Sequence, residues 1–218
     1  MNVLIIAPHP DDEVLGCGGT IAKYVARGDT VSVCYITKAY TPDWTEQYLK
    51  LKEEEIKRSN KILGIKKRFN LNYPTVKLDT IPQKEINEAL ISIIEEVRPN
   101  CALIPNRYDL NIDHRIVHDA ALIGLRPIYH RCSCILSYET LSETEWGISP
   151  FTVQSHYYVN ITATIDKKIK AMEAFKTELK KSPHPRSIEG IRNLAFKRGS
   201  EILVTAAEAF LPIRIIEE

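Results

Sequence analysis

The residues best suited to chemistry stand in "PHPDDE" at positions 8–13, directly after the apolar run "NVLIIA". This stretch places His9, Asp11, Asp12 and Glu13 within five residues. Three adjacent carboxylates and an imidazole repel or desolvate one another unless a cation lies among them. A structural role is also open, because Asp11 or Asp12 could cap a helix that begins near Glu13.

A second cluster, "NRYDLNIDHR", overlaps the end of the apolar run "CALIPN" at residues 101–106. Asp113 could cap a helix that starts at His114, so this cluster alone also favours a structural role. Together, His9, Asp12 and His114 form a set of two histidines and one carboxylate, which suits zinc with an open position for water. His9 and Asp12 are three residues apart, so one turn can aim both at a single point. We therefore expect one zinc ion per chain.

Asp11 lies between two of these ligands in the sequence and must point elsewhere. It can then stand beside the metal as a general base, acting on a water whose pKa zinc lowers to about 7. One short segment thus offers both metal ligands and a base, which predicts metal-assisted hydrolysis.

Strand-like apolar runs alternate with helical periodicity, which favours an α/β fold. We expect a Rossmann-like, mostly parallel, doubly wound sheet with helices on both faces, and residues 1–218 forming one domain. Sites in such sheets form at the carboxyl ends of strands, where both charged clusters lie. The expected strands are 2–7, 30–37, 68–74, 101–106, 134–140 and an edge strand at 156–163; the expected helices are 20–28, 45–65, 81–99, 113–126, 166–181 and 187–210.

Composition limits the partners. The chain has 218 residues, and 29 Lys and Arg against 28 Asp and Glu leave a formal charge of +1 without a basic stripe, so we expect no nucleic-acid partner. No apolar stretch approaches the length of a membrane span, and no signal-peptide pattern is present, so we expect a cytoplasmic location. The five cysteines fit no disulfide framework.

Several segments together resemble the PIG-L/LmbE family of zinc-dependent N-deacetylases. They are "PHPDDE", "GCGGT", "KEEEIKRSNKILGI", "DHR", "TEWG", "HPRS" and "FKRGSEILVTAAEAF". The resemblance implies a Rossmann-like fold, one zinc ion, and hydrolysis of an N-acetyl group from an amino sugar or its conjugate. By position, His9, Asp12 and His114 match the family's metal ligands, Asp11 matches the general base, and Asp113 matches a carboxylate that supports a ligand.

The sequence departs from the family pattern at two positions. Asn111 stands where the family often has a histidine, and an amide can donate to an oxyanion but cannot deliver a proton at neutral pH. Lys52 stands where the family usually has an arginine, which replaces a planar fork by a point charge.

Further substrate contacts are open between two interpretations. Arg107, in the loop of the second cluster, could bind sugar hydroxyls or be a solvated loop residue. His184 and Arg186 lie in "SPHPRS", which is either a connector between helices or a substrate loop, serving its own site or a neighbouring subunit's in a homo-oligomer.

The sequence leaves rival functions open. A dinucleotide enzyme would share the fold, but "GCGGT" lacks the required glycine spacing. A metal-binding protein without turnover is a second rival, and a deacylase of a non-sugar amide is a third. We favour a deacetylase whose partner is a small N-acetylated amino sugar or conjugate.

Overall fold

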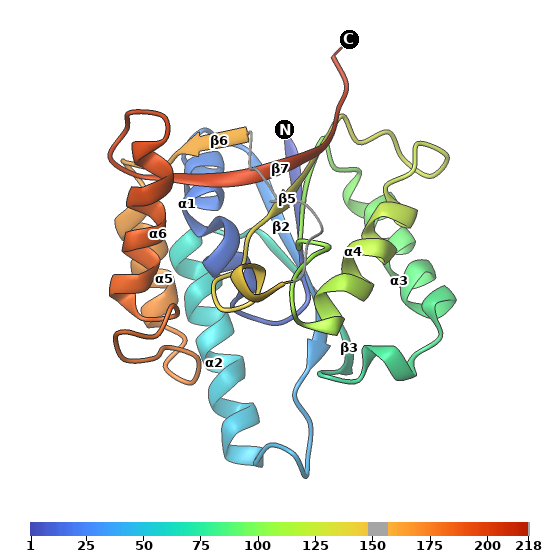
Figure 1. Cartoon of the computed structure of the whole chain (residues 1–218). Helices are drawn as coiled ribbons and strands as arrows, with labels where there is room; N and C mark the ends of the chain where they lie inside the picture. The colour runs from blue at the N-terminus through green and yellow to red at the C-terminus, as the bar shows by residue number, and fades with distance from the viewer. Residues whose placement is uncertain (148–156, 218) are drawn as a thin grey trace.

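The computed structural model describes residues 1–147 and 157–217, and this part of the chain builds one twisted sheet flanked by helices (Figure 1). Seven strands of the described residues lie in the order β3-β2-β1-β4-β5-β7-β6. β1 to β5 are parallel, and β7 is antiparallel to both β5 and β6. The strands are β1 (Asn2–Ala7), β2 (Thr30–Lys38), β3 (Lys67–Pro74), β4 (Cys101–Ile104), β5 (Cys134–Tyr138), β6 (Tyr157–Asn160) and β7 (Ala207–Ile215).

Helices cover both faces of the sheet because its strands are buried on both sides. Along β1, Val3 and Ile5 face one core, whereas Leu4 and Ile6 face the other. The first core is covered by α1 (Asp12–Ala26), α2 (Glu46–Leu63), α5 (Ile165–Glu173) and α6 (Ile188–Ser200), and the second by α3 (Gln83–Val97) and α4 (Ile112–Gly124) (Figure 1). Two short 3₁₀ turns, η1 (Leu78–Thr80) and η2 (Thr144–Trp146), complete these elements. The expected doubly wound α/β fold is confirmed. No described helix has an apolar stretch long enough to cross a bilayer.

The order of the strands determines where a site can form. The chain leaves β1 through α1 on one face, and it leaves neighbouring β4 through α4 on the opposite face. The two connections diverge and open a crevice between the carboxyl ends of β1 and β4, which is where α/β sheets bind ligands. "PHPDDE" follows β1 and "NRYDLNIDHR" follows β4, so both charged clusters flank this crevice.

The C-terminal third differs from the sequence prediction. The helix predicted at 187–210 ends at Ser200, and the residues from Ala207 onward form β7 instead. Pairing with β5 on one side and β6 on the other outweighs the local helical preference. The helix predicted at 166–181 also ends early, at Glu173. The predicted edge strand is present as β6, although residue 156 of that prediction lies outside the described residues.

The glycines of "GCGGT" lie inside α1 and make room for close packing. A Cβ atom on Gly16 would lie 2.3 Å from Cδ2 of Tyr138, and one on Gly19 would lie 2.7 Å from Cδ1 of Ile161. These glycines therefore allow α1 to pack closely against its neighbours and form no phosphate loop after a strand.

A buried ion pair stabilises a kink in α1. Cys17 departs from helical geometry and marks the kink. The Glu208 carboxylate accepts the backbone N–H groups of Gly19 and Thr20 at 2.9 and 2.7 Å, and Lys168 Nζ lies 2.6 Å from the same carboxylate. The pair thus binds the N–H groups just after the kink, in the helix that begins at the metal-binding candidate Asp12.

Removing one partner of this pair should destabilise the protein. Lys168→Met leaves the buried Glu208 carboxylate without its cation, and such a loss costs about 3–5 kcal/mol. We expect that decrease in the free energy of unfolding, measured by urea denaturation. The matched control is Arg192→Met, which breaks a solvent-exposed pair with Asp166 and should cost about 0–1 kcal/mol. Small and equal losses in both variants would contradict this role.

Candidate active site

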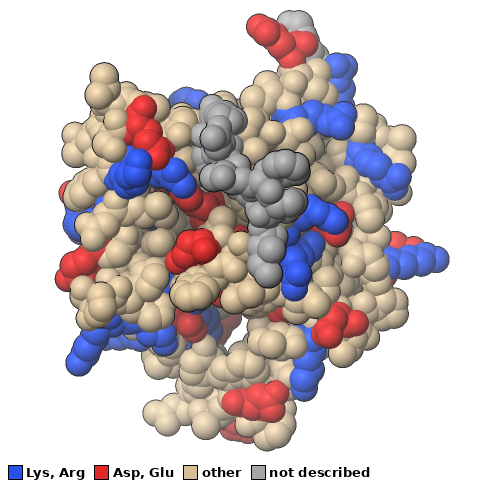
Figure 2. Space-filling view, viewed as in Figure 1, with Lys and Arg blue, Asp and Glu red and all other residues tan. Residues whose placement is uncertain are grey.

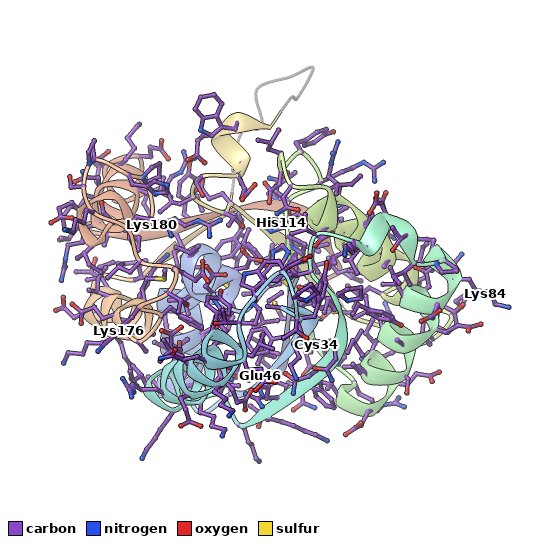
Figure 3. All side chains as sticks on the ribbon, turned by 90° about the horizontal axis from the view of Figure 1, so that it is seen from below. Cys34, Glu46, Lys84, His114, Lys176 and Lys180 are labelled. Atoms are coloured by element: carbon purple, nitrogen blue, oxygen red, sulfur yellow. The ribbon has the colours of Figure 1, made fainter. Side chains whose placement is uncertain are left out.

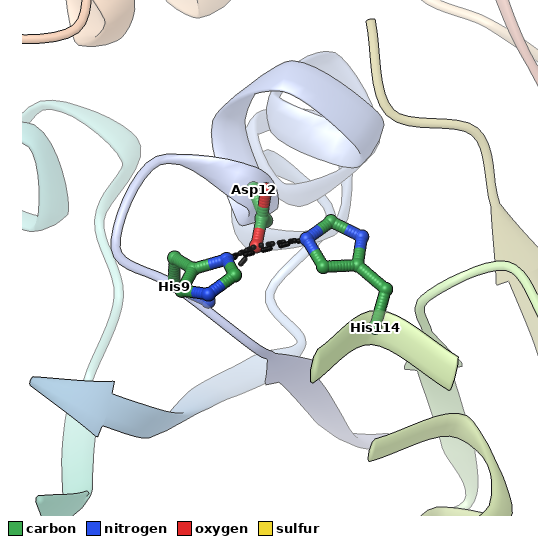
Figure 4. A group of neighbouring side chains, drawn as sticks. All are labelled: His9, Asp12 and His114. Atoms are coloured by element: carbon green, nitrogen blue, oxygen red, sulfur yellow. Dashed lines mark hydrogen bonds and ion pairs between the residues drawn. The ribbon is translucent and has the colours of Figure 1, made fainter. Parts of the chain in front are cut away.

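Two histidines and a carboxylate converge at the crevice (Figure 4). Asp12 Oδ2 lies 3.3 Å from His9 Nδ1 and 3.2 Å from His114 Nε2. The two ring nitrogens are 3.2 Å apart. His114 and Asp12 are buried, and His9 is partly exposed at the crevice. Figure 3 looks from below onto this edge of the sheet and shows His114 near the middle of the molecule.

This triangle has the dimensions of a metal site. Ligand atoms about 2.0–2.1 Å from a tetrahedral zinc ion lie roughly 3.3 Å apart. The outer nitrogens of His9 and His114 donate to other carboxylates, so in the neutral imidazoles both inner nitrogens carry lone pairs. Two lone pairs and a carboxylate oxygen aimed at one point require a cation, and a divalent metal fits these residues.

Asp113 orients the first ligand. Its Oδ2 accepts from His9 Nε2 at 3.0 Å and from the backbone N–H of Val76 at 2.7 Å, while Oδ1 accepts from Leu78 N at 3.2 Å. Burial raises the pKa of Asp113, but the His9 ring and these donors outweigh it and hold the pKa below its ordinary value. Asp113 is therefore ionised and fixes the His9 ring, and it does not cap α4.

Asp109 orients the second ligand. Its Oδ2 lies 2.7 Å from His114 Nδ1, and its Oδ1 accepts from the Thr144 hydroxyl at 2.6 Å. Burial lowers the pKa of His114, but Asp12 and Asp109 outweigh this effect and raise the pKa to about 10. The ring is therefore protonated in the metal-free protein, and a bound metal would displace that proton. Sequence reasoning missed Asp109, whose only signal was a carboxylate within the second cluster.

Asp11 takes an unusual backbone conformation that turns it away from the metal triangle. Its φ is 132°, a value that non-glycine residues rarely adopt. Its N–H donates to Glu13 Oε2 at 2.9 Å, and Glu13 Oε1 accepts from the Tyr35 hydroxyl at 2.8 Å. Asp11 occupies the N-cap position of α1, yet its side chain makes no capping bond. The carboxylate is thus left free for another contact.

Arg186 makes that contact. Its Nη1 lies 3.3 Å from Asp11 Oδ2, and Glu143 and Ser142 hold the rest of the guanidinium at 3.1 and 2.7 Å. Burial raises the pKa of Asp11 to about 6, and the positive charges of Lys52 and Arg186 oppose this rise. Asp11 is therefore a buried carboxyl group that can both accept and release a proton near neutral pH.

Lys52 is the second positive charge that acts on Asp11. Its Nζ binds Glu178 Oε1 at 2.7 Å, and the same oxygen accepts from the Tyr48 hydroxyl at 2.8 Å. The predicted helix 166–181 ends at Glu173, and the chain that follows brings Glu178 against Lys52 of α2. Glu178 is a second residue that sequence reasoning missed.

Asn111 combines a structural role with a place in the pocket wall. Its Oδ1 accepts from Asp113 N at 3.0 Å, which makes Asn111 the N-cap of α4. The capping bond uses the oxygen and leaves the Nδ2 amide hydrogens without a described partner. Asn111 lines the pocket beside the metal triangle.

The structure does not bring every predicted substrate residue to the site. Arg107 pairs with Asp119 and does not line the pocket. His184 is exposed, and its Nδ1 accepts from the Arg186 backbone N–H at 3.0 Å, so it shapes the loop that carries Arg186. His118, one turn beyond the metal-binding candidate His114, is buried against the Pro105 carbonyl.

A pocket of about 700 Å³ is lined by His9 and Asp12 of the metal triangle and by Asp11, Lys52, Asn111 and Arg186. Its volume suits a small organic molecule rather than a lone water or ion. A buried carboxyl group beside an open site of two histidines and one carboxylate is the arrangement with which metal-dependent hydrolases activate water.

Comparisons of the chain with known proteins also indicate a hydrolase. The model of the PIG-L family, described as GlcNAc-PI de-N-acetylase, matches residues 4–123, and this chain belongs to that family. Diacetylchitobiose deacetylase of Thermococcus kodakarensis is 30% identical over 193 residues, which cover 81% of this chain and 70% of the relative.

Two solved structures share the fold. The conserved protein TT1542 of Thermus thermophilus superposes with a TM-score of 0.81 at 24% identity, covering 100% of this chain and 97% of that protein. N,N'-diacetylchitobiose deacetylase of Pyrococcus horikoshii, in complex with its inhibitor MPG, superposes with a TM-score of 0.76 at 26% identity, covering 97% and 83%.

The metal ligands can be tested by metal content. We expect the purified protein to bind one divalent metal per chain, and His9→Ala or His114→Ala to lose most of it, measured by elemental analysis after dialysis. Asp109→Asn keeps the ligands but weakens the hold on His114, so its metal affinity should fall about 10–100-fold. His118→Gln is the control on the same helix and should retain the metal. Full metal content in both alanine variants would contradict the assignment.

Proposed function

We propose that this protein is a zinc-dependent deacetylase that hydrolyses the N-acetyl group of an amino sugar or amino-sugar conjugate. Family membership and the diacetylchitobiose deacetylases among its relatives support this substrate class. Two imidazoles and one carboxylate favour zinc among the divalent metals. The observation that carries the proposal is the position of Asp11, which is buried beside the metal triangle and excluded from it by its backbone conformation.

Zinc bound by His9, Asp12 and His114 would polarise the acetamide carbonyl and lower the pKa of a water to about 7. Asp11 accepts a proton from the attacking water as the new C–O bond forms. The C–N bond then breaks, and the proton held by Asp11 passes to the leaving nitrogen. The products are acetate and the free amine.

The surrounding residues support these steps. The positive charges of Lys52 and Arg186 favour the ionised form of Asp11 before the reaction. Asn111 donates an amide hydrogen to the carbonyl oxygen as negative charge develops there. Arg186 is held by Glu143, so its guanidinium stays in place when Asp11 becomes neutral.

Substitution of Asp11 tests the reaction directly. Asp11→Asn keeps the shape of the side chain but removes the proton acceptor, so kcat for acetate release should fall about 10²–10⁴-fold. Metal content should be unchanged, because Asp11 is not a ligand in this proposal. Wild-type turnover would remove Asp11 from the mechanism, and loss of the metal would make it a ligand.

Asn111 has two roles that a pair of variants can separate. Asn111→Ser keeps a capping oxygen for α4 but loses the amide donor, whereas Asn111→Ala loses both. We expect kcat to fall about 10²–10³-fold in both variants. Only the alanine variant should also lose about 0.5–2 kcal/mol of unfolding free energy. If the serine variant has wild-type kcat, Asn111 is a helix cap and no more.

A further inference from the structure

Glu13 is a buried carboxyl group that the proposed reaction does not use. Charged side chains of both signs are spread over the surface that Figure 2 shows, whereas Glu13 is 0% exposed. It does not line the pocket, and it forms no ion pair with any residue that the structure describes. Burial of a carboxyl group costs free energy unless its hydrogen bonds compensate. The contacts that Glu13 makes therefore indicate what it does.

Two contacts occupy the two oxygens of Glu13. Oε2 accepts the backbone N–H of Asp11 at 2.9 Å, and Oε1 lies 2.8 Å from the Tyr35 hydroxyl. That hydroxyl also lies 2.9 Å from Asn60 Oδ1. Tyr35 belongs to β2 and Asn60 to α2, and both side chains are buried. The Glu13 side chain is thus held by the core of the protein on one side and holds the Asp11 backbone on the other.

The bond from Asp11 to Glu13 fixes one end of a strained residue. A φ of 132° is unfavourable for a residue other than glycine and persists only where the surrounding structure holds it. The Asp11 carbonyl accepts from Val14 N and Leu15 N, both at 2.9 Å, which anchors the following peptide group to α1. Glu13 anchors the preceding peptide group through the Asp11 N–H, for which the structure describes no other partner. These two anchors together determine φ.

We infer that Glu13 is a positioning residue, which fixes the backbone of Asp11 so that its carboxylate stands beside the metal triangle and not within it. The inference rests on the proposed function, since Asp11 is the residue that would accept the proton. Glu13 acts through the geometry of its hydrogen bonds. Without them φ at Asp11 can relax, and the carboxylate leaves the position in which it meets Arg186.

Two substitutions of Glu13 separate its hydrogen bonds from its mere bulk. The Tyr35 hydroxyl has one hydrogen, so only one of its two neighbours accepts and the other must donate. Glu13→Gln satisfies this count, with Oε1 accepting from Asp11 and Nε2 donating to Tyr35. Its kcat should stay within about tenfold of wild type, since a neutral acceptor holds the N–H more weakly. Glu13→Met fills a similar volume without an acceptor, and kcat should fall about 10²-fold, as expected for a catalytic group misplaced by about 1 Å.

Neither substitution should change KM or metal content much, because Glu13 is neither in the pocket lining nor among the metal ligands. Tyr35→Phe removes the hydroxyl that supports Glu13 but keeps the bond to Asp11. We expect its kcat to fall about 2- to 10-fold, the effect of one lost neutral hydrogen bond. Wild-type kcat in Glu13→Met or in Tyr35→Phe would overturn the inference.

Leu90→Ala is the control for a general loss of stability. Leu90 is buried in the second core, whereas Tyr35 lies in the first. The cavity left by this substitution destabilises the fold without removing a hydrogen bond from Asp11. We expect wild-type kcat at a temperature at which the variant is folded. A fall in kcat as large as that of Glu13→Met would make Glu13 a structural residue only.

The conformation of Asp11 in metal-free protein gives a readout that does not depend on turnover. We expect a crystal structure of Glu13→Met to show a negative φ at Asp11 and no contact with Arg186, and Glu13→Gln to keep both features of the wild type. A φ near 132° in Glu13→Met would overturn the positioning role, even in an inactive variant. A relaxed Asp11 in Glu13→Met, without acetate release by metal-loaded wild-type protein, would support the role of Glu13 and contradict the proposed function.

Discussion

The main constraint on this structure is the mutual repulsion of the carboxylates that are buried around two histidines. Burial raises the free energy of every ionised carboxylate, and neighbouring negative charges add to that cost. Lys52 and Arg186 offset this cost for Asp11, and His9 and His114 lie beside Asp12. The buried carboxyl groups of the two charged clusters are Asp11, Asp12, Glu13, Asp109 and Asp113. Their different partners assign them different tasks, from ligand to ligand support to proton acceptor.

The doubly wound sheet makes this concentration of charge possible. Its apolar strands are buried on both faces, so polar groups can gather only where strands end. The divergence of α1 and α4 leaves a crevice between β1 and β4, and each connection brings one part of the site. The tight packing of α1 through Gly16 and Gly19, together with its kink at Cys17, fixes the helix that presents the first cluster.

The sequence predicted the fold and the candidate metal ligands because both follow from local signals. Alternating elements predicted the sheet, and the types and spacing of His9, Asp12 and His114 predicted that they would meet. The ligand-orienting role of Asp109 could not be predicted, since it depends on the path of a loop. The predicted helix 187–210 was wrong at its end, because pairing at the sheet edge outweighs local propensity. The contact of Arg186 with Asp11 could not be predicted either, because it joins residues that lie 175 positions apart in the sequence.

In the proposed site, His9, Asp12 and His114 hold the metal while Asp11 stays free beside it. A crystal structure of zinc-loaded protein, with anomalous data at the zinc edge, tests this arrangement most directly. Our account predicts one ion bound by His9 Nδ1, His114 Nε2 and Asp12 Oδ2 at about 2.0–2.2 Å. The Asp11 carboxylate should lie within hydrogen-bond distance of the open coordination position. An ion bound by Asp11, or bound away from these three residues, would contradict the account.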